Sequence, residues 1–261
     1  MSEPTHDKLI AELTAARLGG TTIASPDFIS DLQTAYSIQE SVSKRLGGTP
    51  VGWKVGSTSL AAQRRLGTSE PGAGRLLSQH TYQSGSRIQI SANHNVQIEI
   101  EFAFIFGKSL APRPKPFCIA EIQQAIDAFL PGIELVGSRY TSGLTGSGRE
   151  AVTADCGANI AFAYGSPVSY KPELNLADQT CRAFINHHQV AKGNGSNALD
   201  DPLNVLVWLA NHLSRRGITL EAGAIVTTGT CTGLTDVKAG DHVAGDFGVL
   251  GRVDAMLTAL G

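Results

Sequence analysis

The chain has 261 residues, of which 42% are hydrophobic and 17% charged, a balance typical of a globular protein that excludes a disordered chain. The net charge of −2 excludes the basic field that binds nucleic acid or an anionic membrane surface, so small metabolites are the expected partners. No stretch approaches the roughly 18 apolar residues of a membrane span, and Met1–Lys8 lack the charged flank and apolar run of a secretory signal.

Four helices are predicted along the chain. The first covers residues 9–18 and has an apolar face that ends at two glycines. The second is predicted to begin at Ser25–Pro26, an N-cap followed by proline at the first helical position, and to end at Gly47–Gly48. A third is predicted around residues 119–130, and a fourth begins at Asp201–Pro202, again a cap followed by proline.

Short strands separated by glycine-rich turns dominate the chain from Val51 to the C-terminus. Neither an internal repeat nor a low-complexity linker interrupts this pattern. The sequence therefore predicts one α+β domain over residues 1–261. In this prediction residues 1–50 form a helical N-terminal part, and residues 51–261 form a β-rich catalytic body with two inserted helices.

The strand predicted over Val96–Phe106 carries a pair of acidic residues on one face. Every second residue of this strand is apolar and faces the core, so Glu99 and Glu101 share the opposite face, about 7 Å apart. Two adjacent carboxylates repel each other, and they are tolerated in water or beside a cation. A solvent-facing surface is one interpretation, but Ala103 and Ile105 continue the same face and favour a partly buried one.

A third acidic residue, Glu134, lies in another apolar strand, where an unpaired carboxylate is costly. Three carboxylates from two strands, without a cysteine or a suitably spaced histidine, predict a site of oxygen ligands for Mg²⁺ or Mn²⁺. The adjacent His187 and His188 are expected at the surface. The four cysteines form no C-x-x-C pair, so we expect free buried thiols and a reducing, cytoplasmic location.

Lys54 lies in a further alternating strand, between Gly52 and Gly56. Glycine on both sides removes the side chains that would cover the lysine and lets a ligand approach. An ordinary exposed lysine is the alternative interpretation. Close to a metal and out of water, Lys54 is expected to have a lowered pKa and to move protons.

A hydroxyl-rich turn follows the strand that begins at Ile225. Its Thr228, Gly229 and Thr230 offer backbone N–H groups and hydroxyls to a substrate carboxylate, although a plain tight turn fits the same residues. The glycine-rich residues 143–150 are not predicted to be a phosphate loop, because they lack the Lys-Ser/Thr pair and no helical pattern follows them.

Five short motifs occur in one order along the chain: G-W-K-V-G at 52–56, E-x-E at 99–101, G-I-E-L-V-x-S-R at 132–139, A-D at 154–155 and T-G-T-C-T-G at 228–233. From about Leu32 to the C-terminus, the chain thereby resembles the 2-keto-4-pentenoate hydratases and 4-oxalocrotonate decarboxylases of the fumarylacetoacetase superfamily. The resemblance implies a mixed β-roll, assembly into a homo-oligomer and a small 2-oxo acid as substrate.

The resemblance also implies which residues form the site. Mg²⁺ or Mn²⁺, held by Glu99, Glu101 and Glu134, would chelate the carboxylate and 2-oxo group of the substrate and stabilise an enolate. Lys54 would transfer the proton.

The same resemblance implies roles in the site for further residues. Asp155 and Ser78 are additional catalytic candidates, and Leu77 joins the threonine turn as a substrate contact. The chain departs from the pattern after Leu77, where an acid is common, and at Gly137, where an aspartate is usual.

The activity implied first is hydration of a 2-hydroxy-2,4-dienoate to a 4-hydroxy-2-oxo acid. The alternative is a metal-dependent decarboxylase of a 2-oxo-enedioate, which needs the same enolate. A hydrolase of C–C bonds is less favoured, because no His–Glu pair precedes the metal strand. A non-catalytic partner subunit is less favoured because the three carboxylates and Lys54 are all present.

Overall fold

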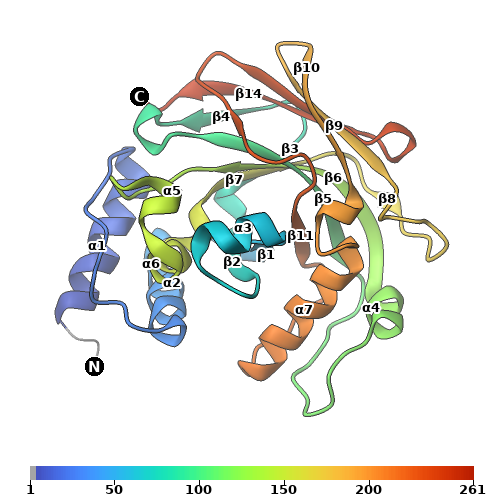
Figure 1. Cartoon of the computed structure of the whole chain (residues 1–261), viewed down its shortest axis with the longest axis horizontal. Helices are drawn as coiled ribbons and strands as arrows, with labels where there is room; N and C mark the ends of the chain where they lie inside the picture. Colours follow the sequence, from blue (N-terminus) through green and yellow to red (C-terminus); the bar gives the residue numbers. More distant parts are fainter. Residues whose placement is uncertain (1–3) are drawn as a thin grey trace.

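The structure, a computed structural model, describes residues 4–261 (Figure 1). Residues 1–3, the start of the segment predicted to lack a secretory signal, lie outside the described part. Within residues 4–261 no helix is both long and apolar enough to cross a membrane. The described helices are α1 (Pro4–Gly19), α2 (Leu32–Leu46), α3 (Leu60–Leu66), α4 (Ile119–Ala125), α5 (Gly143–Gly146), α6 (Gly148–Ala154) and α7 (Pro202–Arg215), with 3₁₀ turns η1 (Ser78–His80), η2 (Ala92–His94), η3 (Cys156–Ala158), η4 (Gly195–Asn197) and η5 (Gly248–Leu250).

A nine-stranded mixed sheet carries the candidate site. Its long central strands, β5 and β6, are paired antiparallel along their length, whereas β1 runs parallel to β11 and β3 runs parallel to β7. In spatial order the sheet contains β2 (Gly72–Leu77), β1 (Pro50–Gly56), β11 (Ile225–Thr230), β5 (Gln97–Phe106), β6 (Ile126–Val136), β7 (Asn159–Tyr164) and β3 (Thr81–Gln83), with β12 (Thr235–Asp236) on β5 and β8 (Val168–Ser169) on β6.

A five-stranded sheet packs across the first sheet, at the top of Figure 1. Phe102 and Phe129 point from the first sheet toward Phe247, and their ring centroids lie 5.1 and 5.6 Å from its ring. The predicted alternation in the 96–106 segment is confirmed, because its apolar members are buried in this core. The second sheet contains, in spatial order, β10 (His188–Asn194), β9 (Thr180–Ile185), β13 (His242–Asp246), β14 (Arg252–Ala259) and β4 (Ser86–Ile90).

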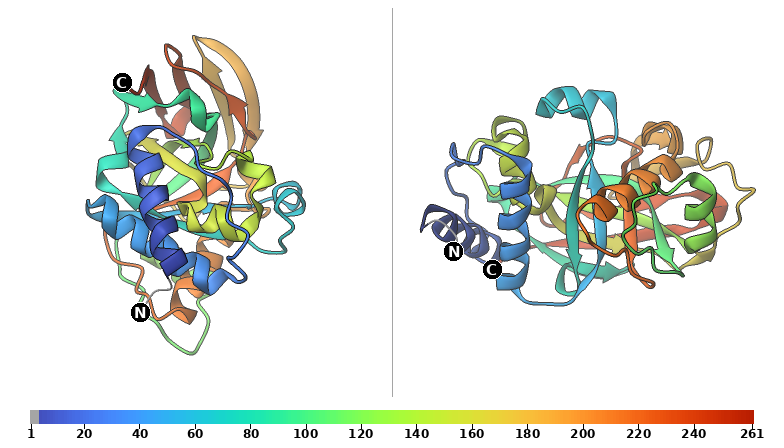
Figure 2. Two further views of the ribbon diagram at one scale, coloured as in Figure 1. Left: turned by 90° about the vertical axis from the view of Figure 1, so that its left-hand side faces the viewer. Right: turned by 90° about the horizontal axis from the view of Figure 1, so that it is seen from below.

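Helices α1, α2 and α6 form a separate layer at one end of the molecule (Figure 2). Leu13 from α1, Ile38 and Val42 from α2, and Ala154 from α6 share a buried apolar cluster with Tyr140. The first predicted helix is confirmed, since α1 ends at Gly19. The N-terminal helices thus pack directly onto the segment that follows β6, which approaches the candidate site.

The second predicted helix begins later than expected. Asp31, not Ser25, is the N-cap of α2, and its Oδ1 accepts a hydrogen bond from Thr34 N at 2.8 Å. The Ser25 hydroxyl instead contacts the hydroxyls of Ser142 and Ser147, which lie 117 and 122 residues away in the chain. The local cap signal at Ser25–Pro26 was therefore overridden by a tertiary contact.

The third predicted helix is cut short. α4 ends at Ala125, and the remaining apolar residues begin strand β6, where Phe129 pairs with Phe104 of β5. A short apolar run fits a buried strand as well as a helix, so periodicity alone could not separate the two. The fourth prediction is confirmed: Asp201 caps α7 and accepts from Leu203 N at 2.8 Å.

Three short helices in the β-rich body were not predicted. α3, α5 and α6 have four to seven residues each, too short for a clear apolar period. The prediction that no helix follows the glycines of residues 143–150 was wrong, because α6 begins at Gly148. The body therefore holds more inserted helices than the two expected, while the α+β class is confirmed.

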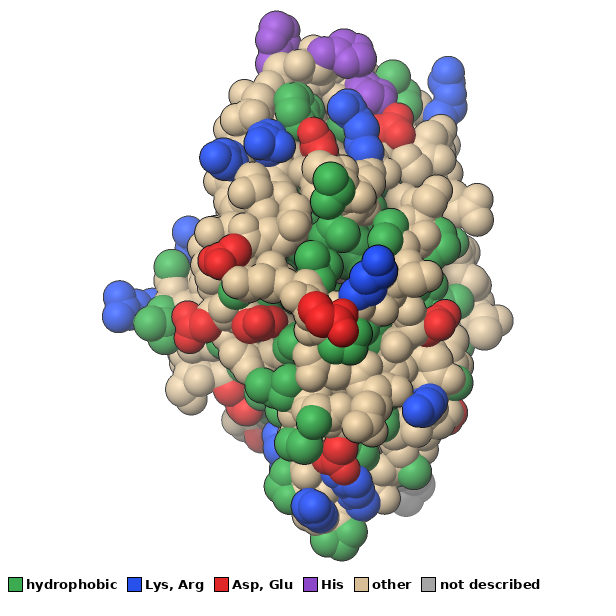
Figure 3. Space-filling view, turned by 90° about the vertical axis from the view of Figure 1, so that its right-hand side faces the viewer, with side chains coloured by type: hydrophobic (Ala, Val, Ile, Leu, Met, Phe, Trp, Pro, Cys, Tyr) green, Lys and Arg blue, Asp and Glu red, His purple; other side chains and the backbone are tan. Residues whose placement is uncertain are grey.

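The surface near the β9–β10 turn carries a group of histidines, seen at the upper edge of Figure 3. His187 and His188 are exposed, as predicted, and the His187 ring lies 5.3 Å from that of His242. The cysteines form no disulfide within the described residues. Three thiols are buried as expected, but Cys118 is exposed at the start of α4.

Candidate metal centre and active site

The register of β5 against β6 brings the three predicted acidic residues together. Glu99 lies directly opposite Glu134, and Glu101 is opposite Gly132, one step along the same face. One carboxylate oxygen from each of the three glutamates lies within 4.8 Å of the others. Glu101 and Glu134 are completely buried, whereas Glu99 is half-buried.

Each of the two buried carboxylates has one bound and one free oxygen. Glu101 Oε2 accepts from Gly229 N at 2.8 Å, and Glu134 Oε1 accepts from Asn159 Nδ2 at 2.8 Å. Glu101 Oε1 and Glu134 Oε2 are buried without a hydrogen-bond partner among residues 4–261. Unsatisfied buried oxygens are costly, and here they lie in one acidic cluster. This donor set fits a divalent cation that prefers oxygen ligands.

The cluster is electrostatically unfavourable without a positive partner. Burial raises the pKa of Glu99 to about 7, and the neighbouring Glu134 adds to the rise. Burial also raises the pKa of Glu101 well above its ordinary value, with contributions from Glu134 and then Glu99. A divalent cation favours the charged carboxylates and removes much of this cost.

A β-bulge in β11 supplies the donor that orients Glu101. The pairing of β11 with β5 shifts between Thr227 and Thr230, so the chain kinks at Gly229. Gly229 has φ 84°, and a Cβ atom there would lie 2.0 Å from Thr58 Oγ1. Glycine is therefore required twice at this position, by the backbone angle and by the close approach.

Lys54 is buried beside the carboxylates. Its Nζ lies 3.3 Å from Glu134 Oε1 and donates to Gly157 O at 2.9 Å. Burial lowers the pKa of Lys54, but Glu134, Glu99 and Glu101 raise it more, so the net shift is upward. The lowering predicted for this pKa applies to Lys54 beside a bound metal and stays a prediction. A bound cation would compete with the lysine for the same negative charge.

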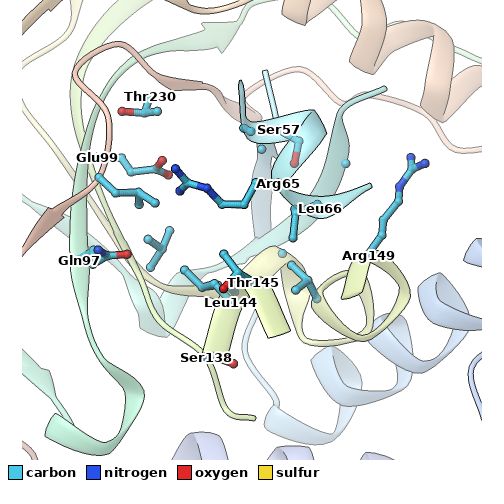
Figure 4. Close-up of a pocket in the computed structure, with 18 of the residues that line it drawn as sticks. Ser57, Arg65, Leu66, Gln97, Glu99, Ser138, Leu144, Thr145, Arg149 and Thr230 are labelled. Atoms are coloured by element: carbon cyan, nitrogen blue, oxygen red, sulfur yellow. The ribbon is translucent and has the colours of Figure 1, made fainter. Parts of the chain in front are cut away.

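A cavity of about 700 Å³ opens in front of this cluster (Figure 4). Lys54 and Glu99 line its strand side, α3 contributes Arg65, and α5 contributes Leu144 and Thr145. Figure 4 shows the Arg65 side chain directed toward Glu99. No hydrogen bond or ion pair is present for Arg65 within the described residues. The cavity therefore offers a free guanidinium opposite the acidic cluster.

The threonine turn is only partly at the cavity. Thr230 lines it, while Gly229 acts through its backbone N–H on Glu101. Thr228 is buried on the opposite face of the strand, and its hydroxyl donates to Phe102 O at 2.8 Å. Residues two apart share a face in a regular strand, and the β-bulge at Gly229 breaks that relation between Thr228 and Thr230.

The structure does not bring Leu77 and Ser78 to the cavity. Both lie at the far end of β2, since Lys54 pairs with Gly74 and the later residues of β2 pair back toward Pro50. Leu77 is buried, and the Ser78 hydroxyl accepts a hydrogen bond from Thr49 N at 3.1 Å. The substrate and catalytic roles predicted for these two residues therefore find no geometric support here.

Asp155 is also outside the cavity lining. Its buried carboxylate pairs with Arg139 at 2.8 Å and with Arg17 at 3.1 Å. Both ion pairs hold the carboxylate away from any ligand in the cavity. The structure places Asp155 in an ion-pair cluster behind the site.

Sequence reasoning missed Gly157 and Asn159, which bind Lys54 and Glu134 respectively. It also missed Arg65 on the unpredicted helix α3. Gly157 and Asn159 follow the A-D motif closely, so their closeness to the motif was visible in the sequence. Their contacts with Lys54 and Glu134 could not be predicted, because these partners lie 103 and 25 residues away in the chain.

Comparison with known proteins agrees with this geometry. The family model "Fumarylacetoacetate (FAA) hydrolase C-terminal" matches residues 69–257. The 2-keto-4-pentenoate hydratase of Paraburkholderia xenovorans (strain LB400) is 32% identical over 214 residues, which cover 81% of this chain and 78% of the relative. The 2-oxo-hept-4-ene-1,7-dioate hydratase of Escherichia coli is 30% identical over 230 residues, 85% of each chain.

A solved structure is similar over almost the whole length. The 4-oxalocrotonate decarboxylase from Pseudomonas putida G7, complexed with magnesium and adipate, superposes with a TM-score of 0.89 at 26% identity and covers 98% of both chains. The curled sheets and the carboxylate cluster beside a buried lysine thus define an enzyme of the metal-assisted, β-roll class. The chain belongs to the fumarylacetoacetate hydrolase family, in the group of the 2-keto-4-pentenoate hydratases. The resemblance inferred from the five motifs, including its mixed β-roll, is confirmed.

Proposed function

We propose that this protein is a metal-dependent hydratase that converts a 2-hydroxy-2,4-dienoate into a 4-hydroxy-2-oxo acid. The observation that carries the proposal is the grouping of three glutamates with Lys54, of which Glu99 and Lys54 line one cavity. The hydratase names of the relatives support the same reaction.

The residues of this chain have separable roles in the proposed reaction. Glu99, Glu101 and Glu134 would hold Mg²⁺ or Mn²⁺, which supplies Lewis-acid stabilisation of enolate charge when bound. Lys54 Nζ holds the proton that moves to the substrate carbon during ketonisation, before water adds to the conjugated enone. Gly157 O and Glu134 Oε1 fix the direction of the lysine.

Arg65 and Thr230 are the substrate contacts that we propose beyond this centre. Both line the cavity, and the Arg65 guanidinium is directed into it (Figure 4). A guanidinium pairs well with a carboxylate in two-pronged geometry. Decarboxylation of a 2-oxo-enedioate remains the second candidate for two reasons. The second carboxylate of such a substrate suits the Arg65 guanidinium, and a decarboxylase shares the fold at 26% identity.

An ultraviolet assay separates these reactions. With MgCl₂ and 2-hydroxypenta-2,4-dienoate, the dienoate absorbance is expected to fall as 4-hydroxy-2-oxopentanoate forms. Release of CO₂ from 2-oxohex-3-enedioate, without hydration of the monoacid, would replace the hydratase proposal by the decarboxylase one. Absence of both reactions at saturating Mg²⁺ would favour the non-catalytic partner subunit.

We also propose that Mg²⁺ is the working ion, with Mn²⁺ able to replace it, since both accept three carboxylates and water. The cytoplasm is the proposed location, because free buried thiols such as Cys181 and Cys231 fit a reducing compartment. One domain over residues 1–261 is proposed on the packing of α1 and α2 against α6.

A homo-oligomer is expected in solution. Val249, in the turn η5 between β13 and β14, is 92% exposed, and Val190 of β10 is 44% exposed. Apolar side chains lie among the charged ones on the face shown in Figure 3. Multi-angle light scattering is expected to give a multiple of the chain mass of 27.4 kDa. A particle of 27.4 kDa from micromolar to near-millimolar concentration would contradict this prediction.

A further inference from the structure

We propose that Arg17 of helix α1 is a positioning residue for the metal centre and for Lys54. The inference rests on the proposed function, because it concerns the same lysine and carboxylates. Arg17 acts through the segment Asp155–Asn159, which lies between the N-terminal helices and the nine-stranded sheet.

The segment Asp155–Asn159 touches both halves of the site. Gly157 O accepts from Lys54 Nζ at 2.9 Å, and Asn159 Nδ2 donates to Glu134 Oε1 at 2.8 Å. A shift of this short segment therefore moves the proton-transfer group and a metal ligand together.

Within this segment the backbone of Cys156 and Ala158 adopts a left-handed conformation that these residue types do not favour. Cys156 has φ 54° and Ala158 has φ 63°, a left-handed region that residues with a Cβ atom rarely adopt. Gly157 between them has φ 62°. Such conformations persist where surrounding contacts over-determine them.

Two arginines provide those contacts: both bind Asp155, and Arg17 also reaches Asn159. Arg17 Nη1 donates to Asp155 Oδ1 at 3.1 Å, and its Nη2 donates to Asn159 O at 2.6 Å. Arg139 Nη2 donates to Asp155 O at 3.0 Å. Among residues 4–261, only the Arg17 side chain joins the first and last residues of the segment, because the planar guanidinium presents its donors in a fixed fork. Its side chain is only 7% exposed, so water competes little for these bonds.

The test compares Arg17→Met with the full-length wild type, using Mg²⁺ alone as the calorimetric titrant and dienoate turnover as a second measurement. Leu9, Leu13 and their apolar neighbours still dock α1 in this variant. We expect about tenfold weaker Mg²⁺ binding and a kcat lowered about 10–100-fold, the range for losing an outer support of a metal site. Mg²⁺ affinity and kcat both within twofold of wild type would overturn the proposal.

Arg113→Met is the matched control. Arg113 forms a 2.6 Å ion pair with Glu121 beside α4, away from the cavity lining. A merely structural loss lowers the unfolding temperature in both variants, whereas only Arg17→Met is expected to change Mg²⁺ affinity. An equal change in Mg²⁺ affinity in both variants would also overturn the positioning role.

Failure of the proposed function and misfolding of the variant can both be distinguished from failure of the positioning role. If wild type binds Mg²⁺ but turns over no dienoate, the proposed function fails and the Mg²⁺ measurement still decides the role of Arg17. If Arg17→Met does not fold, Arg17→Lys decides, since it keeps the charge beside Asp155 and loses the fork that reaches Asn159. Unchanged Mg²⁺ affinity in Arg17→Lys would then overturn the proposal, and weaker affinity would support it.

Discussion

The Glu101→Gln variant is expected to lose the thermal stabilisation that Mg²⁺ gives the wild-type protein. Binding at 100 times the dissociation constant stabilises a fold by about 2.7 kcal/mol. For a chain of this size that is a rise of roughly 5–10 °C in the unfolding temperature. Glutamine keeps an amide oxygen for Gly229 N, so the bulge in β11 is retained while one anionic ligand is lost.

The stability of the metal-free variant gives an independent check. Glu101 is buried beside Glu99 and Glu134, and its carboxylate oxygen Oε1 has no hydrogen-bond partner within residues 4–261. Removing one of three like charges is therefore expected to leave the unfolding temperature in chelator unchanged or higher. Glu173→Gln, an exposed carboxylate outside the cavity lining, serves as control and should show the full Mg²⁺ effect. A full Mg²⁺-induced rise in Glu101→Gln would remove Glu101 from the site.

The Lys54→Met variant is expected to bind Mg²⁺ and pyruvate, a simple 2-oxo acid, about as well as wild type and to turn over the dienoate ~10²–10⁴-fold more slowly. That range is usual for losing a positioned acid–base group. Methionine fills a similar volume, so the packing around Gly157 is kept. Mg²⁺ binding is not weakened, because Glu134 loses a competing positive charge 3.3 Å away.

Calorimetry and the ultraviolet assay measure the two parts of this prediction separately. Lys192→Met, an exposed lysine of β10, is the matched control and should keep normal turnover. Normal turnover in Lys54→Met, together with an inactive Ser78→Ala or Asp155→Asn variant, would show that the lysine is structural. A loss of Mg²⁺ binding in Lys54→Met would instead show that the lysine organises the metal centre.

Several features of the fold could be predicted from local patterns. The period-two alternation of β5 places Glu99 and Glu101 on one face, because neighbouring side chains in a strand alternate whatever the rest of the protein does. The Asp201–Pro202 cap was equally local, since the cap bonds to a residue two positions away. At Ser25 and in the apolar run after Ala125, the local pattern predicted a helix, but a contact with a distant segment decided the structure.

The sequence alone determined the residue types of the site and the face of β5 that carries two of its ligands. Only the tertiary structure decided that Glu134 lies opposite Glu99, because the register of two strands depends on their whole length. It also decided the surroundings of Asp155, whose partner Arg17 lies 138 residues away in the chain. Local periodicity carries no information about such pairs, since burial and long-range ion pairing are set by how the layers pack.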